Sequence, residues 1–202
     1  MQNSCSYKAV LIGNGTMGQR HKRLFEADGI EFIGVADTTA EATALFEQIA
    51  VGKLSPDFAV VASPAVTHDE YVKKSIEIML PVLVEKPVSI SFENAEKFRR
   101  IASERNAFVF VGHSERYNPA IEEFAKTDFF KEMQDYFKFW FLQKQDATPV
   151  SFKFTRTHGF SPRNRDVSVE YDLMIHDMDL LNFFVDKNAM MYKSFHCEEL
   201  SD

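Results

Sequence analysis

Residues 7–27 read YKAVLIGNGTMGQRHKRLFEA. This stretch opens with an apolar, strand-like run, passes three glycines, and continues with apolar residues at helical spacing. The glycines form a G-x-G-x-x-G pattern between a predicted strand and a predicted helix, which is the context of a dinucleotide-binding loop. In such a loop the glycines permit a tight turn, a close approach of main chain to pyrophosphate, and close helix packing. The predicted loop residues are Gly13, Asn14, Gly15, Thr16, Met17 and Gly18.

A carboxylate follows the second predicted strand. Asp37 ends the apolar segment 30–37 and comes 19 residues after Gly18. A carboxylate there accepts hydrogen bonds from the adenosine ribose hydroxyls and repels a 2'-phosphate, so the sequence favours NAD over NADP. The alternative for Asp37 is a turn residue or a helix cap. The glycine pattern alone is a weak signal, because glycines also mark many other strand-to-helix turns.

Strand-like and helix-like segments alternate through the first half of the chain. The predicted strands are 7–13, 30–37, 57–63, 81–86 and 107–113, and helical patterns cover 40–50, 67–79 and 91–106, the last with Ser89 or Ser91 as its cap. Strands that are apolar throughout, separated by amphipathic helices, indicate a parallel sheet covered on both faces. We therefore predict an α/β fold with a doubly wound Rossmann domain over residues 1–115.

The pattern changes after residue 115. Residues 117–145 are helical with an aromatic-rich face, and 170–185 form an amphipathic helix. Residues 150–157 alternate with a period of two, which predicts a strand of antiparallel type. We predict a smaller α+β domain over residues 116–202.

The ends of the predicted parallel strands supply polar side chains. Ligands of doubly wound sheets bind at the carboxyl ends of the strands. Glu85 and Lys86 follow one strand, and Ser63, Pro64 and His68 follow another. A lysine at this edge is suited to hydrogen-bond a substrate oxygen, although most lysines are simply exposed loop residues.

Asp172 and His176 lie four residues apart on the predicted helix 170–185 and therefore share one face. The imidazole is suited to take a hydroxyl proton while the carboxylate orients it. The same spacing suits zinc, for which His158 is the nearby third ligand, but we expect no metal. We expect Asp177 and Asp179 to be solvated or capping groups.

Composition narrows the classes of partner. The net charge of −7 and the pI near 5.4 argue against nucleic-acid binding. No run approaches the roughly 18 apolar residues of a membrane span, and the start lacks a signal-type segment. Cys5 and Cys197 show no metal-ligand spacing and are expected to be free thiols. We expect a cytoplasmic protein.

Five motifs together resemble the glucose-fructose oxidoreductase / inositol dehydrogenase (Gfo/Idh/MocA) family of NAD(P)-dependent oxidoreductases. They are IGNGTMGQRH, VVASPAVTHDEY, VEKPVSIS, GHSERYNPA and YDLMIHDMDLL. The resemblance implies a catalytic group formed by Lys86, Asp172 and His176. It also implies cofactor contacts from the glycine loop, Asp37, Ser63, Pro64, His68, Glu85 and Lys86.

The segments GHSERYNPA and NRDVSVEYDLMIHDMDLL are most similar to the UDP-N-acetylglucosamine 3-dehydrogenase branch of the family. This resemblance implies a nucleotide-sugar substrate bound by Lys86 and His176, together with Arg116, Tyr117, Asn118 and Arg165.

The chain is shorter than the family pattern implies, so we expect a truncated second domain, and apolar surface left there favours a homo-oligomer, a dimer or larger. Two functions stay open. One is an active sugar or nucleotide-sugar dehydrogenase, favoured by the three catalytic side chains. The other is a non-catalytic nucleotide-binding or structural homologue, favoured by the shortened second domain.

Overall fold

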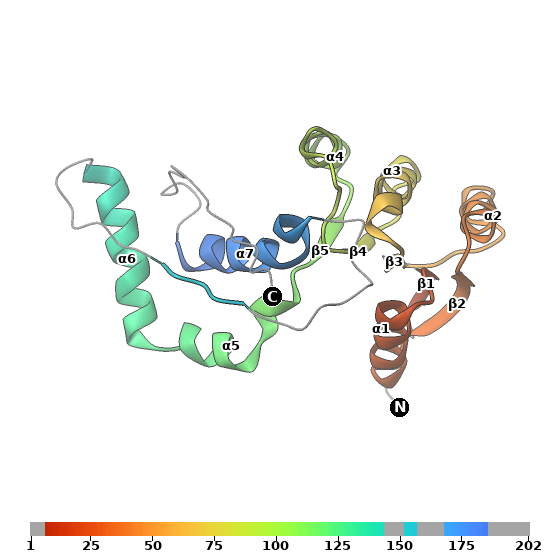
Figure 1. The fold of residues 1–202 in the computed structure, drawn as a ribbon. Helices are drawn as coiled ribbons and strands as arrows, with labels where there is room; N and C mark the ends of the chain where they lie inside the picture. Colours follow the sequence, from red (N-terminus) through yellow and green to blue (C-terminus); the bar gives the residue numbers. More distant parts are fainter. Residues whose placement is uncertain (1–6, 144–151, 157–167, 186–202) are drawn as a thin grey trace, which may run out of the picture. The chain divides into compact units, whose positions relative to one another are not determined.

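The computed structural model describes residues 7–143, 152–156 and 168–185 (Figure 1). The chain divides between Gly112 and His113 into two compact units.

The first unit alternates strands and helices as the sequence predicts. Its elements are β1 (Lys8–Ile12), α1 (Thr16–Ala27), β2 (Glu31–Ala36), α2 (Thr39–Ala50), β3 (Phe58–Val61), η1 (Ala65–Thr67), α3 (His68–Glu77), β4 (Val82–Glu85), α4 (Phe92–Arg105) and β5 (Val109–Gly112). The strands form a five-stranded sheet in the order β2-β1-β3-β4-β5, and every pairing is parallel. The predicted Rossmann-type fold is confirmed.

Successive strands are added to the sheet first on one side of β1 and then on the other. The chain first moves from β1 to β2 on one side, then returns across β1 to β3 and continues to β5. Because crossovers between parallel strands are right-handed, the two directions put helices on opposite faces. Figure 1 shows α1 on one face of the sheet and α2, α3 and α4 on the other. The switch point between β1 and β3 is where doubly wound sheets bind ligands.

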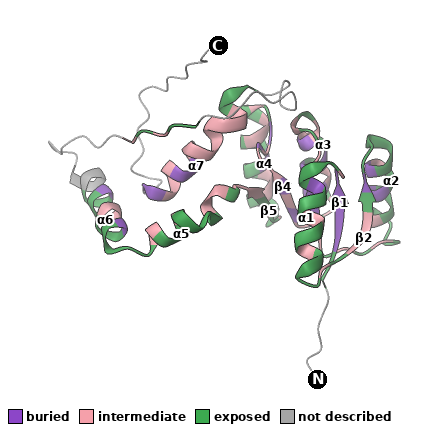
Figure 2. Cartoon of the chain, turned by 60° about the horizontal axis from the view of Figure 1, so that its bottom comes forward, coloured by how far each residue is buried: buried purple, intermediate pink, exposed green. Residues whose placement is uncertain are grey.

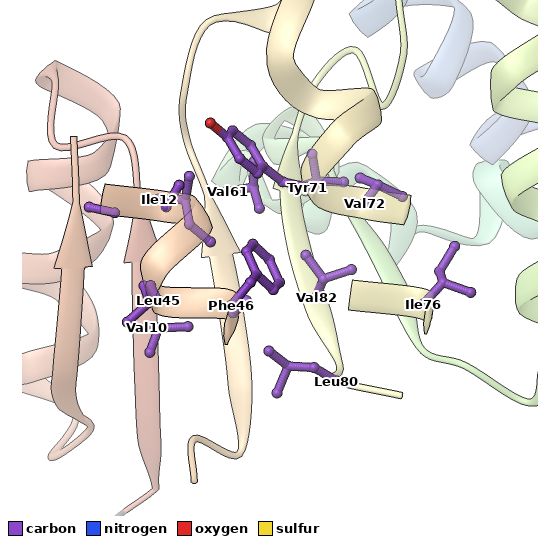
Figure 3. Packing of buried hydrophobic residues seen from close by; sticks show 14 of the residues in the cluster. Val10, Ile12, Leu45, Phe46, Val61, Tyr71, Val72, Ile76, Leu80 and Val82 are labelled. Atoms are coloured by element: carbon purple, nitrogen blue, oxygen red, sulfur yellow. The ribbon is translucent and has the colours of Figure 1, made fainter. Parts of the chain in front are cut away.

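The core of this unit lies between the sheet and helices α2, α3 and α4. Val10, Ile12, Val61 and Val82 point from the strands toward Phe46 and other residues of the helices (Figure 3). Figure 2 shows buried residues along β1 and on the inward faces of the helices. Burying this apolar surface stabilises the packing of the helices on the sheet.

Helices α2 and α4 begin with side-chain caps. Thr38 caps α2 in a capping box with Glu41, and the Ser91 hydroxyl accepts a hydrogen bond from the main-chain N–H of Asn94 at the start of α4. Ser91 is therefore the cap, one of the two serines that the sequence offered.

The second unit contains η2 (Ser114–Tyr117), α5 (Pro119–Ala125), α6 (Asp128–Gln143), the π-helical turn η4 (Glu170–Met174) and α7 (Ile175–Phe184). Its core is aromatic. Phe124, Phe130, Phe183 and Phe184 form edge-to-face and tilted ring contacts. Seven of the chain's 20 phenylalanines belong to the apolar cluster of this unit, namely Phe124, Phe130, Phe137, Phe152, Phe154, Phe183 and Phe184.

The strand predicted over 150–157 is wrong for its described part, because residues 152–156 belong to no strand. Phe152 and Phe154 instead pack against the aromatic cluster, where Phe152 lies 5.8 Å from the ring of Phe137. Alternating apolar residues report burial on one side. They do not report a neighbouring strand to pair with.

Candidate cofactor and catalytic site

One row of paired residues crosses the sheet of the first unit near its carboxyl edge. The register aligns Ala36, Ile12, Val61, Val84 and Val111 in that order. The segments that follow these residues therefore leave the sheet at the same edge. They carry Asp37, the glycine loop, Ser63 and Lys86. Neighbouring parallel strands lie about 4.8 Å apart, so β4 is separated from β1 by roughly 10 Å.

The glycine loop fits closely against β3. Gly13 has a φ of +92°, and a Cβ there would meet the main-chain nitrogen of Ser63 at 2.5 Å. A Cβ on Gly18 would collide with the carbonyl oxygen of Gly13. These two glycines are required for the turn and for helix packing, in agreement with the roles predicted for them.

Gly15 differs because a Cβ at that position would meet nothing within 4 Å. It is the N-cap of α1, it makes no side-chain cap hydrogen bond, and the first turn of α1 carries no acidic residue. Helix starts of this kind attract anions through their main-chain N–H groups and the helix dipole. The loop therefore fits the pyrophosphate of a dinucleotide. Asn14, Thr16 and Met17 lie beside Gly15, and the last two are exposed.

Asp37 lies against this loop. One of its carboxylate oxygens accepts a hydrogen bond of 2.8 Å from the main-chain N–H of Asn14. The carboxylate is exposed and stands at the end of β2, beside the turn that follows β1. It serves as neither the N-cap nor the capping-box residue of α2, since Thr38 and Glu41 take those positions. The helix-cap alternative for Asp37 therefore loses its support.

Glu85 ties the end of β4 to helix α1. Its carboxylate lies 2.6 Å from Nε2 of His21. Burial raises the pKa of Glu85, but the hydrogen bond and charge of His21, with the N–H and charge of Lys86, outweigh burial and lower the pKa. Glu85 is therefore ionised at neutral pH. Lys86 follows it at the edge of the sheet and is partly exposed.

His68 is almost wholly buried, with 1% of its surface exposed. Its Nδ1 lies 2.7 Å from the carbonyl oxygen of Pro87, and its Nε2 lies 2.9 Å from the carbonyl oxygen of Ser63. The ring thus bridges the loop after β3 and the loop after β4. It supports the residues around Lys86 from within the protein.

Ser63 and Pro64 follow β3. The Ser63 hydroxyl contacts the hydroxyl of Thr67 at 2.7 Å, and Pro64 is the exposed N-cap residue of η1. Both residues lie on the loop that follows the strand next to β1, at the switch point.

Asp172 and His176 belong to the second unit. Asp172 lies in the π-helical turn η4, and His176 lies in the first turn of α7. Both residues are partly buried. The sequence predicted one regular helix here, whereas the structure begins it with a wider turn. Such turns are rare and frequently occur at functional sites.

The expectation that Asp179 is solvated or capping is wrong. Asp179 is 6% exposed, and its two carboxylate oxygens accept hydrogen bonds of 2.6 Å from Nε and Nη2 of Arg116. This bidentate pair joins η2 to α7, and the hydrogen bond to Asp179 raises the pKa of Arg116 despite its partial burial. Asp177 is likewise paired, with Arg156 at 2.6 Å. The helical pattern placed these carboxylates outside the apolar face but could not reveal their partners.

Tyr117 and Asn118 lie beside Arg116. Tyr117 is exposed, and the side-chain oxygen of Asn118 accepts a hydrogen bond from the N–H of Ala120, so Asn118 caps α5. Arg165, His158, Cys5 and Cys197 lie outside the described residues. Across the described ranges, no group of three or more His, Cys, Asp and Glu side chains is arranged to hold a metal ion.

Comparison with known proteins identifies the family of this fold and loop. Residues 7–113 match the family model GFO_IDH_MocA, described as an oxidoreductase family with an NAD-binding Rossmann fold. The chain belongs to the GFO_IDH_MocA family. The resemblance noted in the sequence is confirmed, and the cofactor of the family is NAD.

Two curated relatives are named as dehydrogenases. UDP-N-acetylglucosamine 3-dehydrogenase of Acidithiobacillus ferrooxidans is 27% identical over 84% of this chain and 51% of its own length. Myo-inositol dehydrogenase Hyg17 of Streptomyces leeuwenhoekii is 23% identical over 92% of this chain and 56% of its own. The chain thus spans about half the length of the curated relatives that it matches.

The solved structure of the same Acidithiobacillus ferrooxidans enzyme has the same fold, with a TM-score of 0.61 at 24% identity, covering 88% of this chain and 56% of that one.

In the described part of the chain, no helix combines the length and hydrophobicity that crossing a membrane requires.

Three residues of this GFO_IDH_MocA protein take part in the site's architecture without having been predicted. Glu41 was readable, because Thr38 and Glu41 fit the S/T-x-x-E capping-box pattern. His21 and Asp179 gave no local signal, because their partners lie 64 and 63 residues away along the chain.

Proposed function

We propose that this protein is an NAD-dependent oxidoreductase that transfers a hydride from a hydroxyl-bearing carbon of a sugar or nucleotide sugar to nicotinamide. The observation that carries the proposal is the alignment of the glycine loop, Asp37 and Lys86 at one edge of the sheet. A dinucleotide laid along this edge has its pyrophosphate at Gly15 and its adenosine ribose at Asp37.

The chain's own residues hold the cofactor. The N–H groups at the start of α1 would bind the pyrophosphate, and Asp37 would accept hydrogen bonds from the ribose hydroxyls. Ser63 and Pro64 flank the dinucleotide on the β3 side, while His68 and Glu85 hold the neighbouring loops. When bound, NAD supplies the hydride acceptor.

Lys86, Asp172 and His176 form the proposed catalytic group. Lys86 hydrogen-bonds the substrate hydroxyl oxygen, and His176 takes the hydroxyl proton while Asp172 orients the imidazole. As the carbonyl forms, the carbon loses its hydrogen together with the C–H bonding electrons, as a hydride. The hydroxyl proton stays on His176. Retention of all three side chains favours catalysis over the alternative of a non-catalytic homologue.

A nucleotide-linked amino sugar is the proposed substrate class, supported by the 27% identity to UDP-N-acetylglucosamine 3-dehydrogenase. Tyr117, Asn118 and Arg165 are proposed to line the substrate side. Arg116 is proposed to hold the adjoining Tyr117 and Asn118 in place on the substrate side, because its own guanidinium is already bonded to Asp179.

A homo-oligomer in the cytoplasm is also proposed. Phe129 and Phe139 on α6 are 64% and 61% exposed, which supports an association surface. Sedimentation of the purified chain tests it, and a monomer at micromolar concentration would contradict it.

The first experiment measures binding. Thermal unfolding is followed with and without NAD, since a ligand at 100 times its Kd adds about 2.7 kcal/mol of stability. Turnover of a panel of UDP-sugars is then followed by the absorbance of NADH. We expect Lys86→Ala to abolish turnover while NAD still binds, and Lys97→Ala, an exposed lysine on α4, to leave turnover unchanged. Binding without turnover on any sugar would favour the non-catalytic homologue.

A further inference from the structure

The start of α2 presents two acidic side chains at the end of β2. Asp37 lies directly after the strand, and Glu41 lies in the first turn of the helix. Both residues are exposed. Only Asp37 belongs to the residues that the family resemblance assigns to the cofactor.

Glu41 closes the start of α2 through three hydrogen bonds. One of its carboxylate oxygens accepts the main-chain N–H groups of Asp37 at 2.8 Å and of Thr38 at 3.0 Å. The N–H of Glu41 in turn donates to the hydroxyl of Thr38 at 3.3 Å. The hydrogen bonds from the N–H groups of Asp37 and Thr38 lower the pKa of Glu41, so it is ionised at neutral pH.

These hydrogen bonds remove a site for an external anion. Unpaired N–H groups at a helix start attract phosphate. Here the main-chain N–H groups of Asp37 and Thr38 already donate to the carboxylate of Glu41. A 2'-phosphate arriving beside Asp37 would therefore lack these donors and would meet a second negative charge.

We infer that Glu41 is a second determinant of NAD over NADP specificity, acting beside Asp37 by filling the main-chain donors of α2 and repelling a 2'-phosphate. The inference rests on the proposed function, since it requires the dinucleotide to bind at this edge. A capping box alone does not require the charge, because glutamine also serves at this position. Charge and cap can therefore be separated by substitution.

The experiment measures dissociation constants of NAD and NADP for the full chain by titration calorimetry. Glu41→Gln keeps a capping side chain and removes the charge, and Glu41→Lys reverses the charge. The control is Glu93→Gln, in the first turn of α4, which follows β4 rather than β2. Glu93 is the second residue of α4, one position earlier than Glu41 in α2, and its carboxylate accepts a hydrogen bond from the capping hydroxyl of Ser91. It therefore shares with Glu41 an exposed negative charge in the first turn of a helix.

We expect the affinity for NADP relative to NAD to rise roughly fivefold in Glu41→Gln, as for one charge removed near a phosphate in water, and further in Glu41→Lys. We expect Glu93→Gln to leave the ratio unchanged. If NAD binds and neither Glu41 variant changes the ratio, the inference is wrong while the proposed function stands. An equal change in the Glu93 variant also overturns it, because overall charge would then explain the effect. If the native chain binds no NAD, both fail.

Discussion

The Arg116–Asp179 pair makes an asymmetric prediction about stability. The Asp179 side chain is 7% exposed and the Arg116 side chain is 37% exposed. Removing the arginine takes both short hydrogen bonds from a buried carboxylate and leaves it only the more distant Nε2 of His113, at 3.9 Å, among the ion pairs of the described residues. Removing the carboxylate leaves a guanidinium that can turn toward solvent. The two single substitutions should therefore differ in cost although they break the same interaction.

The magnitude follows from the burial of each partner. Breaking a fully buried pair by removing one ion costs about 3–5 kcal/mol. Because Arg116 is more than one third exposed, solvent partly replaces it, and we expect Arg116→Met to cost about 2–3 kcal/mol. Methionine keeps the aliphatic length beside Phe183. Asp179→Asn loses charge-assisted hydrogen bonds without stranding a buried charge, and we expect about 1 kcal/mol.

The assay is urea unfolding followed by fluorescence of Trp140, the only tryptophan of the chain, which lies in the second unit. We expect the double variant to cost about as much as Asp179→Asn alone, because no carboxylate is then left unpaired. The reasoning is refuted if Asp179→Asn costs as much as Arg116→Met. It is equally refuted if the two costs add in the double variant.

Three further predictions concern the first unit. Gly15→Ala should leave the melting temperature unchanged but block NAD binding, because the added Cβ would enter open space at the start of α1. Gly18→Ala should destabilise the fold, because its Cβ would collide with the main chain of Gly13. Equal melting temperatures for the two variants would contradict this. Because the pKa of Glu85 is lowered, its ionised form stabilises the fold above pH 4.5, and this stability is lost as pH falls through the lowered pKa. In acid titrations, Glu85→Gln should therefore flatten the fall in the free energy of unfolding below pH 4.5. An unchanged slope of that free energy against pH would exclude the ion pair as its source. His68→Leu should cost about 1–3 kcal/mol in urea unfolding, because a carbonyl oxygen that accepts the ring N–H is left unpaired. A neutral result would mean that the bridge is unimportant.

The sequence by itself determined the architecture of the first unit. Apolar runs of strand length, helical spacing and the glycines at 13, 15 and 18 each act within a few residues, so the order of elements could be read directly. The parallel sheet followed from strands that are apolar on both faces. Its carboxyl edge then placed Asp37 and Lys86 near the loop, because the ends of parallel strands meet at one edge.

Tertiary structure alone decided the partners of charged and polar groups. Asp179 has the spacing of a solvated helix residue, yet Arg116, 63 positions away, makes its burial favourable. His68 has the appearance of a ligand contact, yet two carbonyl oxygens occupy its ring. Local pattern reports which side of an element is apolar, because that depends on periodicity. It cannot report which charge compensates another, because that depends on segments that only folding brings together.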